Sequence, residues 1–214
     1  INFTNVTSRE GNNTWTVYCN NTAGNIRGAS VFFTKDTISP NGTLISPLNN
    51  SFVNNATQNM TLNASDLTSL SNATLFIYNS SNSLVNQTTR IINGGTQALV
   101  GIVYNFLYDG VFTWFYRIVD IAGNQFTTTN STITVDTHAP IVYLNITNNT
   151  FFRTNNVLLN YTPLDSVSIK ECSLYINGNQ NMTNQSNILT NQVNNFSLTL
   201  ANGNYEWYVL CSDL

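Results

Sequence analysis

The sequence predicts an all-β protein made of Greek-key β-sandwiches joined end to end, and two observations carry this prediction. The first is an internal repeat with a spacing of roughly 95 residues, about the size of one β-sandwich domain. The second is a series of short segments in which apolar and polar residues alternate, separated by turn residues and without helical periodicity. The repeated residues are Trp114, Ile118, Ala122, Gly123, Asn124, Asp136, Thr137 and Pro140, which recur upstream as Trp15, Cys19, Ala23, Gly24, Asn25, Asp36, Thr37 and Pro40; downstream, Trp207, Cys211 and Asp213 copy Trp114, Ile118 and Asp120.

The repeat divides the chain into three segments. Residues 1–36 carry strands that match only the end of a repeat, including a Trp15–Cys19 strand with one face expected to be buried, and such a remnant cannot bury a core alone. Residues 37–136 form one complete immunoglobulin-sized repeat, and residues 137–214 form a second copy without a counterpart of the closing strand. We expect either that the chain is cut from a longer repeat protein, or that a neighbouring subunit inserts the missing strand, as in donor-strand polymerisation.

The alternation also predicts which side chains face the core. In the complete repeat the inward positions are Met60, Leu62, Ala64, Ala73, Leu75, Ile77, Phe112, Trp114, Tyr116 and Ile118, and in the second copy they include Cys172, Leu174 and Ile176. Several aromatic residues fall on the outward side instead, namely Phe76, Tyr78, Phe115, Tyr175 and Tyr208. Because contiguous exposed apolar surface usually marks an interface, these aromatic residues favour self-association.

Charge is scarce, because only 8% of the residues are charged and the net charge is -3. The few lysines and arginines do not cluster, which argues against binding to nucleic acid or to anionic membranes. No run of about 18 apolar residues occurs, so we expect no membrane span.

Acceptor sites for N-linked glycosylation are frequent. Nineteen Asn-x-Ser/Thr sequons occur, whereas random placement of the same residues would give about eight. Their asparagines are Asn2, Asn5, Asn12, Asn20, Asn41, Asn49, Asn55, Asn59, Asn63, Asn72, Asn79, Asn86, Asn130, Asn145, Asn148, Asn160, Asn181, Asn184 and Asn195. This density predicts an extracellular chain whose N-linked glycans supply the solubility that charge does not; the alternative is accidental matching in an Asn- and Thr-rich composition.

The three cysteines predict one disulfide within the chain. Cys172 and Cys211 occupy inward positions of strands expected to be neighbours, and Ala73 and Ile118 take the same places in the complete repeat. A Cys172–Cys211 bond would stabilise the fold by about 4 kcal/mol according to the chain-entropy model. Cys19 is equivalent to Cys211, so we expect its partner outside the chain; the alternative is a buried free thiol. The spacing of zinc ligands is absent.

The pattern of Trp114, Ile118, Asp120 and Ala122-Gly123-Asn124, followed by Val135-Asp136-Thr137 and Pro140, resembles tandem immunoglobulin-like (Ig/Fn3-like) repeats of archaeal and bacterial cell-surface or filament proteins. Trp207, Cys211 and Asp213 resemble a disulfide-bearing variant of archaeal surface proteins. The resemblance implies the immunoglobulin-like form of the predicted sandwich and an extracellular or cell-surface location. Such families include adhesins, stalks and filament subunits.

The resemblance also implies a calcium site, because some bacterial adhesins of this kind hold Ca²⁺ with aspartates of these motifs. The matching residues here are Asp120 and Asp136 at one junction, and Asn21 and Asp36 at the other. Calcium prefers six to eight oxygen ligands, several of them anionic, so two carboxylates per junction are few. The alternative is that Asp120 caps a turn and Asp136 begins a linker.

No catalytic residues are predicted, and we expect neither an enzyme nor a required cofactor. The only histidine, His138, lies in a linker for which the sequence indicates no orienting partner or pocket. Asp165 and Glu171 are a candidate carboxylate pair of the glycosidase type, but they flank a turn without a cleft and are expected to be surface charges.

The function that these observations favour is mechanical. We expect a structural subunit or segment of a glycosylated extracellular filament, stalk or surface-layer protein that self-associates. The alternatives are spacer repeats of a cell-surface adhesin or receptor-binding protein, or a carbohydrate-binding accessory module.

Overall fold

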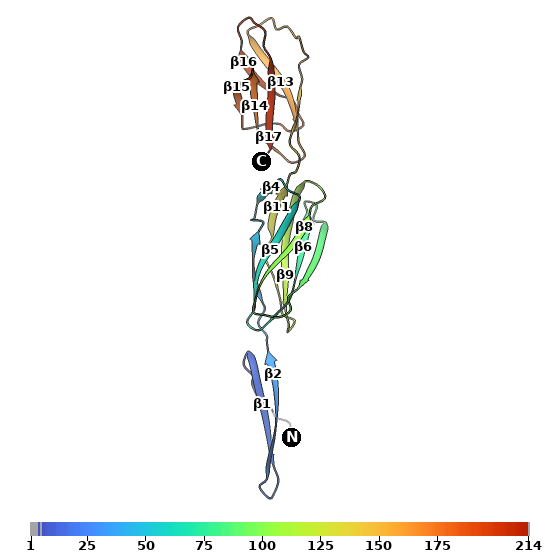
Figure 1. Cartoon of the computed structure of the whole chain (residues 1–214), viewed down its shortest axis with the longest axis vertical. Helices are drawn as coiled ribbons and strands as arrows, with labels where there is room; N and C mark the ends of the chain where they lie inside the picture. The colour runs from blue at the N-terminus through green and yellow to red at the C-terminus, as the bar shows by residue number, and fades with distance from the viewer. Residues whose placement is uncertain (1–3, 5, 214) are drawn as a thin grey trace. The chain divides into compact units, whose positions relative to one another are not determined.

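The computed structural model describes residue 4 and residues 6–213, which form seventeen β-strands (Figure 1). The prediction of an all-β protein is therefore confirmed. The described residues contain no helix that is long and apolar enough to cross a bilayer. The chain separates into two compact units: one holds the residues up to Asn49, Gln58–Tyr104 and Phe112–Thr132, and the other holds Asn50–Thr57, Asn105–Val111 and the residues from Ile133 onward.

The first two strands, β1 (Gly11–Asn20) and β2 (Ile26–Lys35), form a two-stranded antiparallel hairpin, which we call the N-terminal hairpin. Asn21 closes its turn, since its Oδ1 accepts the backbone N–H groups of Ala23 and Asn25. The predicted strand is present, but the prediction that one of its faces is buried is wrong for the described residues. Trp15 and Val17 remain 41% and 42% exposed, because a hairpin alone has no second layer to cover it.

The next nine strands form the middle sandwich. They are β3 (Asn41–Ser46), β4 (Ser51–Val53), β5 (Thr57–Ser65), β6 (Leu70–Asn79), β7 (Leu84–Ile91), β8 (Gln97–Asn105), β9 (Gly110–Asp120), β10 (Gln125–Thr127) and β11 (Ser131–Val135). One sheet has the order β3-β5-β8 and the other has the order β4-β11-β9-β6-β7, with β10 on β9. This arrangement is that of an immunoglobulin-like sandwich, in which β3, β5 and β8 form one sheet and the other strands form the second.

The core of the middle sandwich lies between these sheets. Met60 and Leu62 of β5, and Trp114 and Tyr116 of β9, are fully buried, as the alternation predicts. The Tyr116 hydroxyl donates a hydrogen bond of 2.7 Å to the Met60 carbonyl oxygen, which links the two sheets. Burial raises the pKa of Tyr116, so the phenol stays protonated and keeps this bond.

The last six strands form the C-terminal sandwich. They are β12 (Ile141–Leu144), β13 (Asn156–Leu164), β14 (Ile169–Ile176), β15 (Asn179–Asn184), β16 (Asn194–Thr199) and β17 (Trp207–Asp213). Their sheets have the orders β12-β13-β16 and β15-β14-β17, which match β3-β5-β8 and β7-β6-β9. Asn50 and Asn149, which follow the first strand of each sandwich, both have a φ of 61°, a conformation that asparagine adopts more readily than most residues. The repeat in the sequence is thus a repeat in structure.

The two sandwiches fill one position of their cores differently. Gly42 lies against Ile118, so a Cβ atom at Gly42 would overlap the Ile118 Cδ1 atom. In the C-terminal sandwich the equivalent residues are Val142 and Cys211, and both pack against the core cluster. A small residue therefore faces a large one in the middle sandwich, and the sizes are exchanged in the C-terminal one.

Candidate functional site

Two groups of three aspartates are the strongest candidate functional sites in the described residues. Within each group, carboxylate oxygens lie within 4.8 Å of one another. Carboxylates at this separation repel one another unless protons, hydrogen-bond donors or a cation offset their charge. The first triad is Asp36, Asp66 and Asp120, and the second triad is Asp136, Asp165 and Asp213. The members correspond one to one in the repeat: one aspartate precedes β3 or β12, one follows β5 or β13, and one ends β9 or β17.

The second triad contains an uncompensated carboxylate. Asp136 is 6% exposed, and both of its oxygens are buried without a hydrogen-bond partner of normal geometry. Burial raises the pKa of Asp136, and the charges of Asp165 and Asp213 raise it further; the backbone amide of His138 lowers it only in part. An isolated buried carboxylate is costly, so this position calls for a proton or a cation.

Asp165 is held in place by its own turn. Its Oδ1 accepts the backbone N–H groups of Val167 at 2.7 Å and Ser168 at 2.8 Å. The sequence predicted a solvated surface charge at this position, but Asp165 is half-buried and belongs to the triad. Glu171, its predicted alternative partner, instead accepts a hydrogen bond from Gln185 at 2.9 Å. The carboxylates that converge on Asp165 are therefore those of Asp136 and Asp213, and Glu171 is not among them.

The first triad receives more hydrogen bonds. The Thr68 hydroxyl donates to Asp36 and Asp66, and Asp66 Oδ2 also accepts the backbone N–H of Ser69 at 2.8 Å. Asp120 accepts two hydrogen bonds of 2.8 Å from the backbone and side chain of Asn124. Donors therefore offset much of the negative charge, although Oδ1 of Asp66 remains buried and unpaired.

One substitution within the repeat explains this difference. Thr68 of the middle sandwich corresponds to Val167 of the C-terminal sandwich, and each lies two residues after the aspartate of the same turn. Valine fills the same space but lacks the hydroxyl that reaches Asp36. Asp136, the counterpart of Asp36, consequently has no side-chain donor to accept from among the described residues.

Three convergent carboxylates fit a hard cation with oxygen ligands such as Ca²⁺, with backbone or water oxygens completing the shell. The sequence-based expectation placed Asp120 and Asp136 at one junction, and this grouping is wrong, because each belongs to a different triad. Asn21 belongs to neither triad and caps the β1–β2 turn. The repeat equivalence of Asp66 with Asp165, and of Asp120 with Asp213, is the sequence signal from which the other members of the triads could have been found.

The threonines after Asp36 and Asp136 make a second repeated contact. Glu10 accepts hydrogen bonds from the backbone N–H of Thr37 at 2.9 Å and from its hydroxyl at 2.8 Å. Lys35 Nζ lies 2.6 Å from the same carboxylate. The hydrogen bond from Lys35, followed by those from Thr37, lowers the pKa of Glu10 to about 2.

Asp109 is the counterpart of Glu10, and it binds both Thr137 and His138. Its Oδ1 accepts the Thr137 hydroxyl at 2.9 Å, and its Oδ2 lies 2.6 Å from His138 Nδ1. Burial raises the pKa of Asp109, but the hydrogen bonds from His138 and Thr137 outweigh it, so the pKa is lowered. The hydrogen bond to Asp109 raises the pKa of His138.

The expectation that His138 has no orienting partner is therefore wrong. Its environment is nevertheless not that of a catalytic histidine, because its side chain is 81% exposed. Thr137 and Asp109 also contact the same nitrogen, Nδ1. A catalytic triad uses one ring nitrogen for the carboxylate and the other for the hydroxyl. The geometry is that of a surface ion pair.

The structure joins Cys172 and Cys211 in a disulfide with an S–S distance of 1.99 Å. The two residues lie directly opposite each other on β14 and β17, as Ala73 and Ile118 do on β6 and β9. Cys19 is a free cysteine and is exposed. The alternative of a buried free thiol is therefore wrong.

The sequon asparagines lie at the surface. Asn2 and Asn5 fall outside the described residues, and each of the remaining seventeen is exposed or half-buried. Asn86 differs from the others because its Nδ2 atom, to which a glycan would be attached, is buried without a partner. Asn86 pairs with Ile77 across β6 and β7 and therefore points toward the core side of the sheet.

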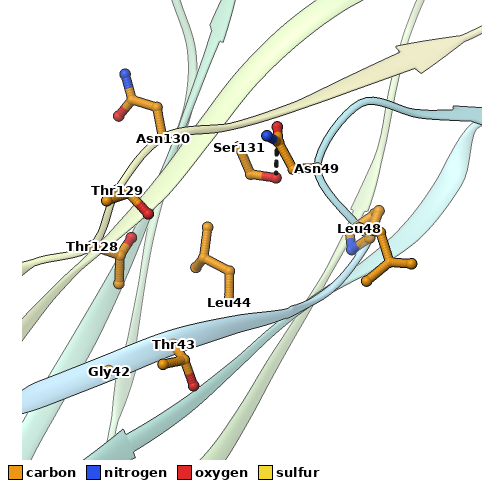
Figure 2. Close-up of a pocket in the computed structure, with 10 residues that line it drawn as sticks. Gly42, Thr43, Leu44, Leu48, Asn49, Thr128, Thr129, Asn130 and Ser131 are labelled. Atoms are coloured by element: carbon orange, nitrogen blue, oxygen red, sulfur yellow. Dashed lines mark hydrogen bonds between the residues drawn. The ribbon is translucent and has the colours of Figure 1, made fainter.

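A shallow hollow of about 310 Å³ lies beside β3. Leu44 projects between β3 and the Thr128–Ser131 segment, and Asn49 bonds Ser131 across it (Figure 2). The Asn49 Oδ1 atom also accepts the backbone N–H of Thr132 at 2.8 Å. The lining residues are Gly, Thr, Leu, Pro, Asn and Ser, so they include no ionisable side chain for acid–base chemistry.

No family model and no curated protein matches the sequence. Among solved structures, the chain is similar to fibronectin(III)-like modules of Clostridium thermocellum CbhA, with 15% identity and a TM-score of 0.35 over 79% of this chain and 84% of that chain. It is also similar to a tetra-tandem repeat in the extending region of a large adhesion protein, with 20% identity and a TM-score of 0.41 over 94% of this chain and 48% of that chain. At TM-scores this low, neither similarity assigns a function, and the immunoglobulin-like fold follows from the strand order itself.

Proposed function

We propose that the chain is a structural repeat segment of an extracellular, N-glycosylated filament, stalk or surface-layer protein, and that its role is to bear load. This proposal rests on an Asp-Thr linker that occurs twice in the chain, in which the threonine and the aspartate contact different groups. Thr37 and Thr137 bind the acidic residue of the turn before β1 or β9, whereas Asp36 and Asp136 join the acidic triad of the sandwich that follows. Each linker is thus bonded on both of its sides.

A divalent cation in the second triad belongs to this proposal. It would bind Asp136, Asp165 and Asp213 and offset the charge that burial makes costly. Ca²⁺ is the preferred ion, because it accepts several carboxylates in an irregular shell. The bound ion would connect the residue after β11 to the turn after β13 and to the end of β17.

Single-molecule pulling tests the load-bearing role. We expect two distinct unfolding events, one for each sandwich, with the event of the C-terminal sandwich shortened by its disulfide. Reduction should lengthen that event by about 130 Å, since the bond spans 39 residues and an extended residue contributes about 3.5 Å. The event of the middle sandwich should not change. Unfolding without measurable force in both sandwiches would contradict the proposal.

Glycopeptide mapping of the native protein tests the extracellular part of the proposal. We expect glycans at exposed acceptors such as Asn63 and Asn195, because these side chains point to solvent. Asn86 should remain unmodified, because its Nδ2 atom is buried. Unmodified asparagine at every exposed sequon would overturn the proposed glycosylation, whereas the pulling experiment would still test the mechanical role.

A carbohydrate-binding module is the second candidate, and one observation favours it. Tyr175 and Tyr208 stack with ring centroids 4.8 Å apart, and Tyr208 is 45% exposed. Aromatic faces of this kind also bind sugars, so the variant Tyr208→Ala should abolish any saturable binding to polysaccharide. Binding that persists in Tyr208→Ala would remove the aromatic pair as the sugar site, and no saturable binding by the wild type would remove this candidate.

A further inference from the structure

The face of β1 that carries Trp15, Val17 and Cys19 is exposed in the described structure. In the described residues β1 pairs with β2 along one edge, and its other edge has no strand beside it. Trp15 packs edge-on against Phe33 of its own hairpin at 5.1 Å, but it remains 41% exposed. Apolar side chains on one face of a two-stranded hairpin indicate that further strands cover this face.

The middle sandwich shows what covers the equivalent face. Trp114, Tyr116 and Ile118 occupy the positions of Trp15, Val17 and Cys19, and all three are fully buried. There, β6 pairs with the edge of β9 that corresponds to the free edge of β1, and it places Ala73 opposite Ile118. The face therefore has a defined partner in the repeat: an antiparallel strand equivalent to β6, together with the sheet that faces it.

The C-terminal sandwich shows what lies opposite a cysteine at this position. Cys211 corresponds to Cys19, and its cross-strand neighbour on β14 is Cys172, with the Cα atoms 4.0 Å apart. Where the position holds isoleucine the neighbour is alanine, and where it holds cysteine the neighbour is cysteine. The chain has three cysteines, and two of them are already bonded to each other.

We propose that β1 receives an antiparallel strand from an immunoglobulin-like half-sandwich outside these 214 residues, and that this strand carries a cysteine bonded to Cys19. By analogy with Cys172, Leu174 and Ile176, the cysteine is followed by apolar residues two and four positions later. The two thiols lose two protons and two electrons when the S–S bond forms. The electrons pass to the disulfide of a thiol oxidoreductase, which becomes a dithiol.

Peptide mapping of the native protein without reduction tests this inference. Free thiols are first blocked with N-ethylmaleimide in denaturant, and the digest is analysed by mass spectrometry. We expect the Cys19 peptide to be linked to a peptide that is foreign to this sequence and has the Cys-x-apolar-x-apolar pattern. A maleimide adduct on Cys19, a bond between the Cys19 residues of two copies, or a bond to a small thiol would overturn it. Cys172 and Cys211, which must appear unmodified by maleimide, are the internal control.

Amide hydrogen exchange gives a readout that does not depend on the covalent bond. The backbone N–H groups on the free edge of β1 should exchange slowly in the native protein and quickly in the isolated 214-residue chain. Those of β14, which has strands on both sides, should be protected equally in both. Equal exchange of β1 in the two samples would show that no strand is added there, and would overturn the inference.

Discussion

The middle and C-terminal sandwiches solve the same packing problem in two ways. At one level of the core, the middle sandwich places Ile118 opposite Ala73 and leaves room for it with Gly42. The C-terminal sandwich has a disulfide at this level and fills the remaining space with Val142. Where the isoleucine is replaced by a disulfide, the residue on the first strand therefore also changes, from Gly42 to Val142.

Removing the disulfide should give the largest effect. The double variant Cys172→Ala/Cys211→Ala is expected to lose about 4 kcal/mol of stability in the C-terminal sandwich, since the bond restricts the unfolded chain. Denaturant unfolding monitored by tryptophan fluorescence should resolve this loss. Dithiothreitol should act in the same way on the wild type and leave the middle sandwich unchanged; equal loss in both sandwiches would contradict the comparison.

Copying the C-terminal residue into the middle sandwich should be the next most damaging change. Gly42→Val is expected to destabilise the middle sandwich by about 3 kcal/mol, because the new Cβ overlaps Ile118. The double variant Gly42→Val/Ile118→Cys restores the size relation of the C-terminal sandwich. A double-mutant cycle should show that the second change recovers part of the loss; additive losses would mean that the two positions do not share the space.

Replacing one aspartate by asparagine should change the stability of the chain in opposite directions in the two triads. The raised pKa of Asp136 means that stability falls as the pH rises from 3.8, the ordinary value, through the folded-state value. Asp136→Asn should therefore stabilise the chain by about 1 kcal/mol at neutral pH in EDTA. Asp36→Asn, the matched control, should destabilise it, since Asp36 accepts hydrogen bonds from Thr68 and Ile38.

Calcium should reverse the order of stability of the wild type and the Asp136→Asn variant. At a hundred times its dissociation constant, Ca²⁺ is expected to stabilise the wild type by about 2.7 kcal/mol, and Asp136→Asn should lose this gain. Thermal unfolding with Ca²⁺, with Mg²⁺ and with EDTA gives the measurement. Identical unfolding curves in all three conditions would show that the second triad does not bind a divalent cation.

The smallest expected effect is the pH dependence of the linker contacts. The raised pKa of His138 stabilises the fold below 6.5 and this contribution disappears as the pH rises through the folded-state value. The lowered pKa of Asp109 stabilises above 3.8 and this contribution disappears in acid. His138→Gln should therefore lower the melting temperature slightly between these values and have less effect at pH 9. Glu10→Gln should keep its effect at pH 9, since Glu10 contacts a lysine and a threonine and no histidine.

The sequence predicted the strands whose pattern reports burial, and missed those without such a pattern. The strands β5, β6 and β9 contain the inward residues predicted for them, because these residues are apolar and alternate with outward ones. By contrast, β7 (Leu84–Ile91) and β15 (Asn179–Asn184) lie at sheet edges and are mostly polar, so their alternation carries no signal. The position of such an edge strand can be predicted from the strand that it pairs with, but not from its own residues.

The candidate site was predictable only in part, for a similar reason. Asp136 was identified from its motif, but its neighbours Asp165 and Asp213 come from turns and strand ends that only the fold brings together. The uncompensated state of Asp136 depends on Val167, which is an ordinary residue by itself and becomes informative only beside Thr68. Likewise, Asp109 meets His138 across 29 residues, and neither residue belongs to a recognisable motif with the other.

The Asp-Thr linker has a consequence for how such chains change length. The middle sandwich carries a complete set of contacts: Asp109 before β9 for the threonine that leaves it, and Asp66 and Asp120 for the aspartate that enters it. A duplication of the coding DNA between two Asp-Thr positions would therefore create a junction whose partners are already present. Unequal crossing-over could lengthen or shorten the protein by whole repeats, without a single compensating mutation at the new boundary.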